Sequence, residues 1–156
     1  MPARRKIALI SGGSRGLGAE LVTGFLDRRY GVATLSRSKT AFIADMQRGS
    51  RRRRFLWSCV DGRDPEALQA FVREVGERLG RIDVLVNNAG VAADGILATM
   101  RTREIIEVIE ANLTAALVLA RACSRFMLRQ GSGCIVNISS VHAIRGASWP
   151  GPTVSV

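Results

Sequence analysis

The sequence predicts an α/β protein built on a doubly wound parallel sheet. Short apolar segments alternate with helical segments along the chain, and no second pattern interrupts this alternation. The apolar segments are continuous rather than alternating, as is typical of parallel strands that are covered on both faces. A glycine-rich turn, Ser11-Gly12-Gly13-Ser14-Arg15-Gly16-Leu17-Gly18, separates the first strand from the first helix. Together these observations favour repeated βα units with right-handed crossovers.

The first half of the chain contains three strands and two helices. The apolar run Ile7-Ala8-Leu9-Ile10 opens the first strand, and a helix is expected over residues 15–29. The second strand is expected at 32–36, with a helical stretch near 40–47. The third strand is expected at 55–59, where aromatic and apolar residues follow a run of arginines.

The second half repeats the pattern. Asp64 is a good helix cap and Pro65 a good first helical residue, so the next helix runs to about Leu79. A strand at 82–86, a loop at 87–99, a long helix at 103–129 and a strand at 134–138 follow. The expected strand order is 3-2-1-4-5, with a ligand crevice between the first and fourth strands. Residues 1–146 form one dinucleotide-binding domain that lacks the last strands, and 147–156 an irregular tail.

Composition narrows the class of protein. With 156 residues, 47% hydrophobic and 23% charged, the chain suits one water-soluble domain. No apolar run is long enough to cross a membrane, and the basic start lacks the apolar stretch of a signal peptide, which predicts a cytoplasmic location. Three widely spaced cysteines and a single histidine give no metal-ligand pattern, so no metal site is expected.

The formal charge of +10 comes mainly from arginine, since Lys6 and Lys39 are the only lysines. The arginines are scattered apart from Arg51-Arg52-Arg53-Arg54, which lies between a helix and a strand and is expected to be a solvated loop. No aromatic residues alternate with this run, as a single-strand binding surface would need. No nucleic-acid partner is therefore expected.

The glycine turn has the geometry of a phosphate cradle. Its spacing is G-x-x-x-G-x-G, between an apolar strand and a helix. Glycines let the backbone approach a pyrophosphate, and the helix start offers free N–H groups and the positive end of the helix dipole. The plainer alternative is an ordinary βα turn.

Further motifs follow in order. Asn87-Asn88-Ala89-Gly90 follows the fourth strand, Asn112 lies in the long helix, and Ile138-Ser139-Ser140 follows the fifth strand. With the glycine turn, these motifs resemble the short-chain dehydrogenase/reductase family, and are similar to its 3-oxoacyl-[acyl-carrier-protein] reductases and related ketoreductases. The resemblance reaches to about Gly146.

The resemblance implies roles for particular residues. The expected cofactor-binding residues are Gly12, Ser14, Arg15, Gly16, Leu17, Gly18, Asp61, Gly62, Asn88, Ala89 and Gly90. Ser140 would hydrogen-bond a substrate carbonyl, and Asn112 would hold a water in a proton relay. The alternatives are that Ser140 merely ends a strand and that Asn112 is a solvated helix residue. The substrate would be a small carbonyl compound or alcohol.

The residues after the second strand indicate the cofactor. An NAD-binding protein of this fold places a carboxylate there to accept the ribose hydroxyls, but this chain has Ser36-Arg37-Ser38. Arg37, with Arg15, would pair with a 2′-phosphate, which favours NADP(H). The alternative is that both arginines are surface residues.

The family also uses a tyrosine and a lysine that this chain does not supply. Thirteen residues after Ser140, at the tyrosine's usual place, stands Thr153, and the single tyrosine of the sequence is Tyr30. Reduction of a ketone needs a proton donor, so we expect carbonyl reduction by family but no turnover by this chain. The alternative is a non-catalytic NADP(H)-binding protein or scaffold. A homo-oligomer and a completing subunit are both left open, because the fifth strand would be an uncovered edge.

Overall fold

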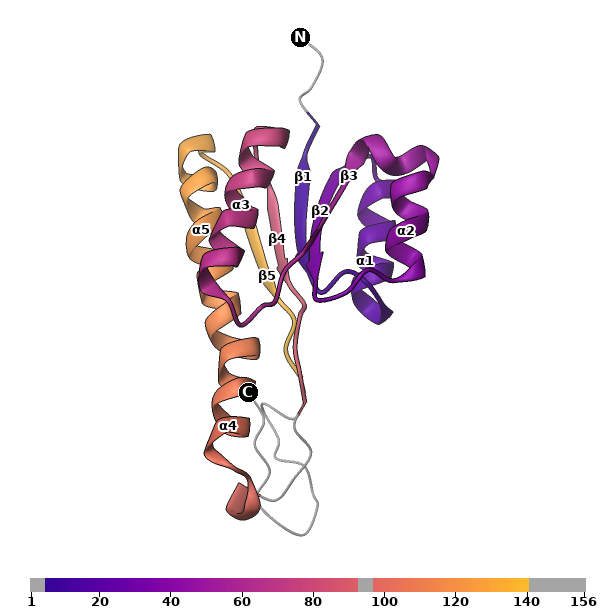
Figure 1. Cartoon of the computed structure of the whole chain (residues 1–156). Helices are drawn as coiled ribbons and strands as arrows, with labels where there is room; N and C mark the ends of the chain where they lie inside the picture. Colours follow the sequence, from indigo (N-terminus) through magenta and orange to yellow (C-terminus); the bar gives the residue numbers. More distant parts are fainter. Residues whose placement is uncertain (1–4, 93–96, 141–156) are drawn as a thin grey trace.

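The computed structural model describes residues 5–92 and 97–140, and they form one parallel sheet between two layers of helices (Figure 1). The strand order β3-β2-β1-β4-β5 confirms the predicted order. The strands are β1 (Ile7–Ser11), β2 (Gly31–Ser36), β3 (Phe55–Cys59), β4 (Val84–Asn87) and β5 (Cys134–Asn137). All pairings are parallel, and β1 lies between β2 and β4 at the centre.

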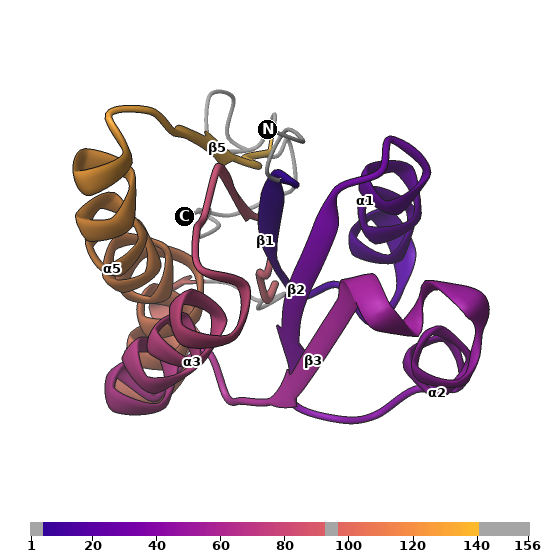
Figure 2. The ribbon, with the colours of Figure 1, turned by 90° about the horizontal axis from the view of Figure 1, so that it is seen from above.

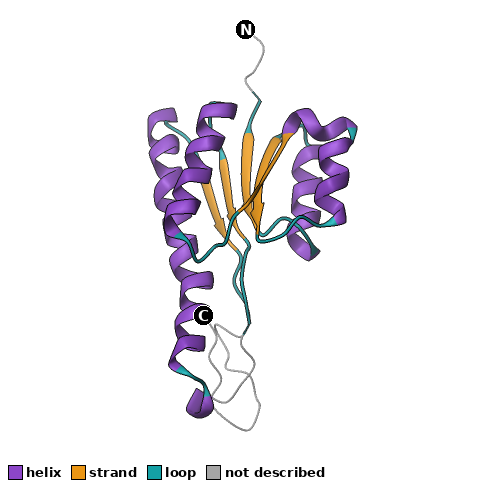
Figure 3. Cartoon of the chain, in the orientation of Figure 1, coloured by secondary structure: helices purple, strands orange, loops and turns teal. Residues whose placement is uncertain are grey.

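The helices fall on opposite faces of the sheet, as the view along the strands shows (Figure 2). On one face lie α1 (Gly16–Asp27) and α2 (Ala41–Arg48). On the other lie α3 (Pro65–Leu79) and α5 (Ala115–Gln130), while α4 (Thr102–Ile109) extends beyond the carboxyl ends of the strands (Figure 3). Short helical turns occur at η1 (Ser50–Arg54), η2 (Leu97–Thr99) and η3 (Glu110–Thr114). None of the helices in the described ranges is long and apolar enough to cross a membrane.

Side chains that alternate along the strands fill two cores. Leu9 and Leu85 pack with α3 and α5, whereas Ile10 and Val86 pack with α1. Both faces of β1 are therefore buried, which explains its uninterrupted apolar sequence.

The residues that were predicted to start α3 do so in the structure. Asp64 Oδ1 accepts hydrogen bonds from the backbone N–H groups of Glu66 (3.0 Å) and Ala67 (2.9 Å), and Pro65 is the first helical residue. Gly80 ends the helix at a φ of 76°, a conformation that glycine adopts without a Cβ penalty. The boundaries of this helix agree with the prediction.

The prediction of one long helix over 103–129 is wrong in one respect. Residues Glu110–Thr114 form a π-helical turn, which divides the helical segment into α4 and α5. The hydrophobic periodicity does not reveal one extra residue in a turn. π-Helical turns of this kind are frequent at functional sites, and Asn112 lies within this one.

The arginine run is not the solvated loop that was predicted. It forms η1, and Arg54 Nη1 donates to the Leu26 carbonyl oxygen at 2.7 Å. Arg51 pairs with Asp27 at 2.6 Å. These two arginines are half-buried, and Arg52 and Arg53 are exposed. The carbonyl groups at the end of α1 need donors, and arginine side chains supply them.

Strand β5 has exposed side chains along its whole length, as expected for an edge strand. Val136 and Ile138 are 39% and 44% exposed. Helices α1 and α2 lie on one face of the sheet on the side of β2 and β3, away from β5 (Figure 2). The expected tail at 147–156, with Thr153, lies outside the described residues.

Candidate functional site at the carboxyl ends of the central strands

The glycine turn joins β1 to α1 at the carboxyl edge of the sheet. Gly12 and Gly16 have φ angles of 71° and 52°, in the left-handed region that suits glycine. The Gly12 N–H donates to the Leu35 carbonyl oxygen at 2.9 Å, which ties the turn to the end of β2. Gly16 faces open space, because no described atom outside its chain neighbours and its own helix backbone lies within 4 Å of where its Cβ would be.

The start of α1 has no side-chain cap among the described residues. No side chain caps it at Arg15, and its first turn carries no acidic residue. Arg15, Gly16 and Leu17 are exposed. The first N–H groups of a helix have no intrahelical partner, and they lie at the positive end of the helix dipole. Together with the open space at Gly16 they suit an anionic group such as a phosphate.

The turn is locked against the segment after β4. A Cβ atom on Gly18 would collide with the Gly12 carbonyl and approach Asn88 Nδ2 to 2.7 Å. Asn88 Nδ2 donates to the carbonyl oxygens of Ser11 (3.0 Å) and Gly12 (3.3 Å). A Cβ on Gly12 would lie 3.0 Å from Ala89 Cα. The structure thus brings Gly12, Gly18, Asn88 and Ala89 together, and their role in binding a cofactor stays a prediction.

Two buried hydroxyl groups that the sequence analysis missed hold this arrangement. Ser11 Oγ accepts from the N–H groups of Asn88 and Ala89, both at 3.0 Å. Thr34 Oγ1 accepts from the Gly13 N–H at 3.0 Å and donates to the Ile10 carbonyl oxygen at 2.7 Å. A polar residue inside an otherwise apolar buried strand was the signal for both.

Ser14, another predicted cofactor residue, is buried beneath the turn. Its carbonyl oxygen accepts from Thr40 Oγ1 at 2.9 Å. Thr40 also caps α2, since its hydroxyl accepts from the Ile43 N–H at 3.4 Å. The hydroxyl of Thr40 therefore links the glycine turn to the segment that follows β2.

Arg37 and Asp61 follow β2 and β3, which are neighbouring strands. The Cys59 Sγ donates to the Arg37 carbonyl oxygen at 3.2 Å, and the Arg37 side chain is exposed. Hydrogen bonds from Arg63 lower the pKa of Asp61 to about 2, and the positive charge of Arg37 contributes further. The Asp61 carboxylate is thus already paired with Arg63, at 2.7 Å. Gly62 lies against α5, where its Cβ would be 3.9 Å from Ala115 Cβ.

Asn112 holds the backbone that follows β4. Its Oδ1 accepts from the Val91 N–H at 2.8 Å, and its Nδ2 donates to the Val91 carbonyl oxygen at 2.9 Å. A Cβ on Gly90 would lie 3.4 Å from Asn112 Oδ1. The alternative of a merely solvated helix residue is therefore excluded. The relay role of Asn112 stays a prediction.

Ser140 lies beyond β5 at the same edge of the sheet. The Ile138 N–H donates to the Asn87 carbonyl oxygen at 2.9 Å, and Asn87 Nδ2 donates to Asn137 Oδ1 at 2.8 Å, so the ends of β4 and β5 are fixed together. Ser140 follows and is exposed. Tyr30 lies at the opposite edge, just before β2, with its ring 5.1 Å from that of Phe25.

A glycine turn at the switch point of a 3-2-1-4-5 parallel sheet, with an uncapped helix start beside it, defines a Rossmann-like nucleotide-binding class of domain. Within this class the relevant family is clear: the sequence matches the short chain dehydrogenase family over residues 6–151. The chain belongs to the short-chain dehydrogenase family.

Individual relatives agree with this assignment. The chain is 33% identical over 147 residues to the 3-oxoacyl-[acyl-carrier-protein] reductase FabG of Vibrio cholerae, a match that covers 90% of this chain and 57% of the relative. It is 31% identical to carbonyl reductase family member 4 of Xenopus laevis, over 90% of this chain and 58% of that protein. The solved structure of ElxO with NADP bound is 29% identical and superposes with a TM-score of 0.82, over 91% of this chain and 58% of ElxO. The chain therefore spans somewhat less than two thirds of these relatives.

Proposed function

We propose that this chain binds NADP(H) across the carboxyl ends of β1 and β4. The uncapped start of α1 next to the open space at Gly16 is the observation that carries this proposal. The pyrophosphate would accept hydrogen bonds from the N–H groups at Gly16, Leu17 and Gly18, with Arg15 beside them. Asn88, Ala89 and Gly90 would line the ribose side of the crevice. Hydrogen bonds to Ser11 hold the backbone of Asn88 and Ala89 against the glycine turn, and Gly90 follows them.

The choice of NADP(H) over NAD(H) rests on Arg37. The exposed guanidinium follows β2, where a 2′-hydroxyl or 2′-phosphate is recognised in this fold. Arg37 is next to Ser36 and Ser38, and no carboxylate follows β2 in this segment. A positively charged group here favours a phosphate over a hydroxyl. That the related ElxO was solved with NADP supports the same choice.

By family, the reaction would be reduction of a small carbonyl compound to an alcohol. Bound NADPH supplies a hydride, and Ser140 would donate a hydrogen bond to the carbonyl oxygen at the end of β5. Asn112, which holds the Val91 backbone after β4, would hold a water in the proton relay. The chain has no tyrosine or lysine near Ser140 that could deliver a proton to the carbonyl oxygen. Tyr30 lies at the other edge of the sheet, Lys6 precedes β1, and Lys39 follows β2. We therefore propose that the 156-residue chain binds the cofactor without turnover.

A thermal-shift titration of the full chain with NADPH and NADH tests the binding step. A ligand at 100 times its Kd stabilises the folded state by about 2.7 kcal/mol, so binding raises the Tm measurably. We expect a larger rise with NADPH than with NADH. No rise with either would refute the site, and equal rises would refute the role of Arg37. An assay of NADPH oxidation with a simple ketone tests the expected lack of turnover.

The second candidate is a non-catalytic NADP(H)-binding scaffold that pairs with another subunit. The observation in its favour is the exposed face of β5, with Val136 and Ile138 accessible to a partner. This candidate predicts NADPH binding together with a stable complex on mixing with a full-length homologous reductase. Size-exclusion chromatography of the mixture, with light scattering, distinguishes it from a chain that stays alone.

A further inference from the structure

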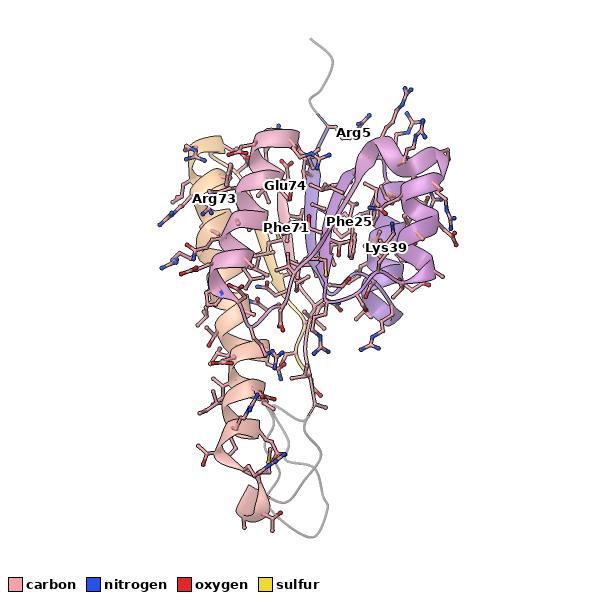
Figure 4. The ribbon with its side chains drawn as sticks, viewed as in Figure 1. Arg5, Phe25, Lys39, Phe71, Arg73 and Glu74 are labelled. Atoms are coloured by element: carbon pink, nitrogen blue, oxygen red, sulfur yellow. The ribbon has the colours of Figure 1, made fainter. Side chains whose placement is uncertain are left out.

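Arginines that are scattered in the sequence meet at the amino edge of the sheet, opposite the proposed cofactor site. They come from the start of β1, the end of α1 and the turn η1. We call this surface the amino-edge arginine patch; its members are Arg5, Lys6, Arg28, Arg29, Arg51, Arg52, Arg53 and Arg54. Figure 4 shows Arg5 beside the start of β1.

Contacts around Gly31 hold the three segments together. The Gly31 N–H donates to the Lys6 carbonyl oxygen at 2.9 Å. A Cβ at Gly31 would lie 3.7 Å from Arg5 Cδ and 3.8 Å from the Arg54 carbonyl oxygen. Arg54 in turn reaches the Leu26 carbonyl oxygen at 2.7 Å. These contacts place the three segments that carry the patch next to one another.

The patch carries far more positive than negative charge. Asp27 is the one carboxylate on its three segments, and it is paired with Arg51. The nearby carboxylates of Asp45 and Asp83 are paired with Arg48 and Arg81, outside the patch. Six cationic side chains, Arg5, Lys6, Arg28, Arg29, Arg52 and Arg53, are exposed. Much of the chain's formal charge of +10 is therefore concentrated here.

We propose that the amino-edge arginine patch binds the phosphate backbone of duplex nucleic acid, without sequence preference. Exposed large apolar side chains among the described residues lie elsewhere, on α1, α4, α5, β5 and the intervening segments, and none lies in the patch. The buried core of a protein interface is typically depleted of charge and enriched in aromatic residues, and membrane insertion uses apolar side chains. Contacts to phosphate need only cations, and guanidinium groups suit them well. This proposal differs from the expectation of no nucleic-acid partner, which rested on arginines scattered along the sequence and on the lack of aromatic residues within the arginine run.

Fluorescence anisotropy of the full chain with a labelled 20-base-pair DNA duplex of mixed sequence tests the proposal. We expect a Kd on the order of 10⁻⁶–10⁻⁴ M near physiological salt, weakening steeply as NaCl rises. The double variant R52E/R53E replaces two exposed side chains and leaves the contacts of Arg51 and Arg54 intact. It should weaken binding at least tenfold and reduce the slope of log Kd against log salt by about 1 to 2.

The matched control is R73E/R125E, which makes the same change of charge on exposed positions of α3 and α5. Equal weakening by both variants would overturn the patch, because net charge alone would then explain binding. R5E/K6E, on a different segment, is the second test if R52E/R53E does not fold, as judged by circular dichroism, and it should weaken binding to a similar degree. Tighter binding to phosphatidylserine vesicles or to polyglutamate than to the duplex would also overturn the proposal.

Discussion

Gly18 and Asn88 are in direct contact at the point where β1, α1 and β4 meet: a Cβ on Gly18 would lie only 2.7 Å from Asn88 Nδ2. The same Cβ would collide with the Gly12 carbonyl group. Backbone atoms of the turn cannot move aside without breaking the Asn88 hydrogen bonds to Ser11 and Gly12. This contact couples the cofactor turn to the segment after β4.

Substitution G18A should therefore destabilise the protein, by about 1–3 kcal/mol from overpacking, and abolish binding of NADPH. In an unconstrained helix the same change would stabilise by up to about 1 kcal/mol. The control is G24A in the same helix, where the new Cβ would meet only the flexible end of Arg28 at 3.4 Å. We expect G24A to stabilise. Urea unfolding of both variants makes the comparison, and equal effects would contradict the packing argument.

Asn112 should be a positioning residue for the loop after β4. In N112A both hydrogen bonds to Val91 are lost, at a cost of about 1–2 kcal/mol, and NADPH affinity falls because Gly90 and Val91 are no longer held. N112D keeps the acceptor for the Val91 N–H and should lose less. Urea unfolding and a fluorescence titration with NADPH measure the two effects. An N112A protein with unchanged stability and affinity would show that the clamp has no role.

Arg37 should determine the preference for NADPH. In R37A we expect NADPH affinity to fall about tenfold or more, as for loss of a hydrogen bond to a charged group, with NADH affinity unchanged. R73A removes an exposed arginine from α3 and serves as the control for charge. Titration calorimetry with both cofactors makes the test. An equal loss of affinity for NADH would show that Arg37 does not act through the 2′-phosphate, which NADH lacks.

The Asp61–Arg63 pair predicts a particular pH dependence. Because the hydrogen bond from Arg63 lowers the pKa of Asp61 from 3.8 to about 2, the folded protein binds fewer protons than the unfolded chain between these pH values. The stabilisation by Asp61 is complete above about pH 4 and disappears as the pH falls to about 2. It is below about 1 kcal/mol, since the side chain is 38% exposed.

D61N should accordingly be less stable than the original protein at pH 6, and the difference should shrink towards zero near pH 2. Guanidinium unfolding of both proteins at several pH values measures it. A difference that stays constant with pH would mean that the carboxylate charge contributes nothing. An NMR titration of the Asp61 carboxyl carbon gives the midpoint directly.

The sequence predicted the strand order and the place of the cofactor turn because both follow from local patterns. Apolar runs mark strands, and Gly12, Gly16 and Gly18 mark a turn that only glycine fits. The π-helical turn around Asn112 was not predictable, since one extra residue hardly changes the hydrophobic period over a long helix. The pairing of Asp61 with Arg63 was missed for a similar reason: charge pairing depends on side-chain direction, which spacing alone does not give.

The arginine run shows most clearly what sequence reasoning missed, and Arg54 provides the last test. Its Nη1 donates to the Leu26 carbonyl oxygen at 2.7 Å, at the end of α1, where carbonyl groups lack helical partners. A cation at this end also interacts favourably with the negative end of the helix dipole. R54A should destabilise the protein by about 1–2 kcal/mol, whereas R53A, at an exposed neighbouring position, should leave stability unchanged within about 0.5 kcal/mol. Thermal unfolding at low and high salt separates the contributions: the loss in R54A should largely persist in 0.5 M NaCl, because the hydrogen bond is half-buried. Equal stabilities of R54A and R53A would show that η1 is the solvated loop its composition suggests.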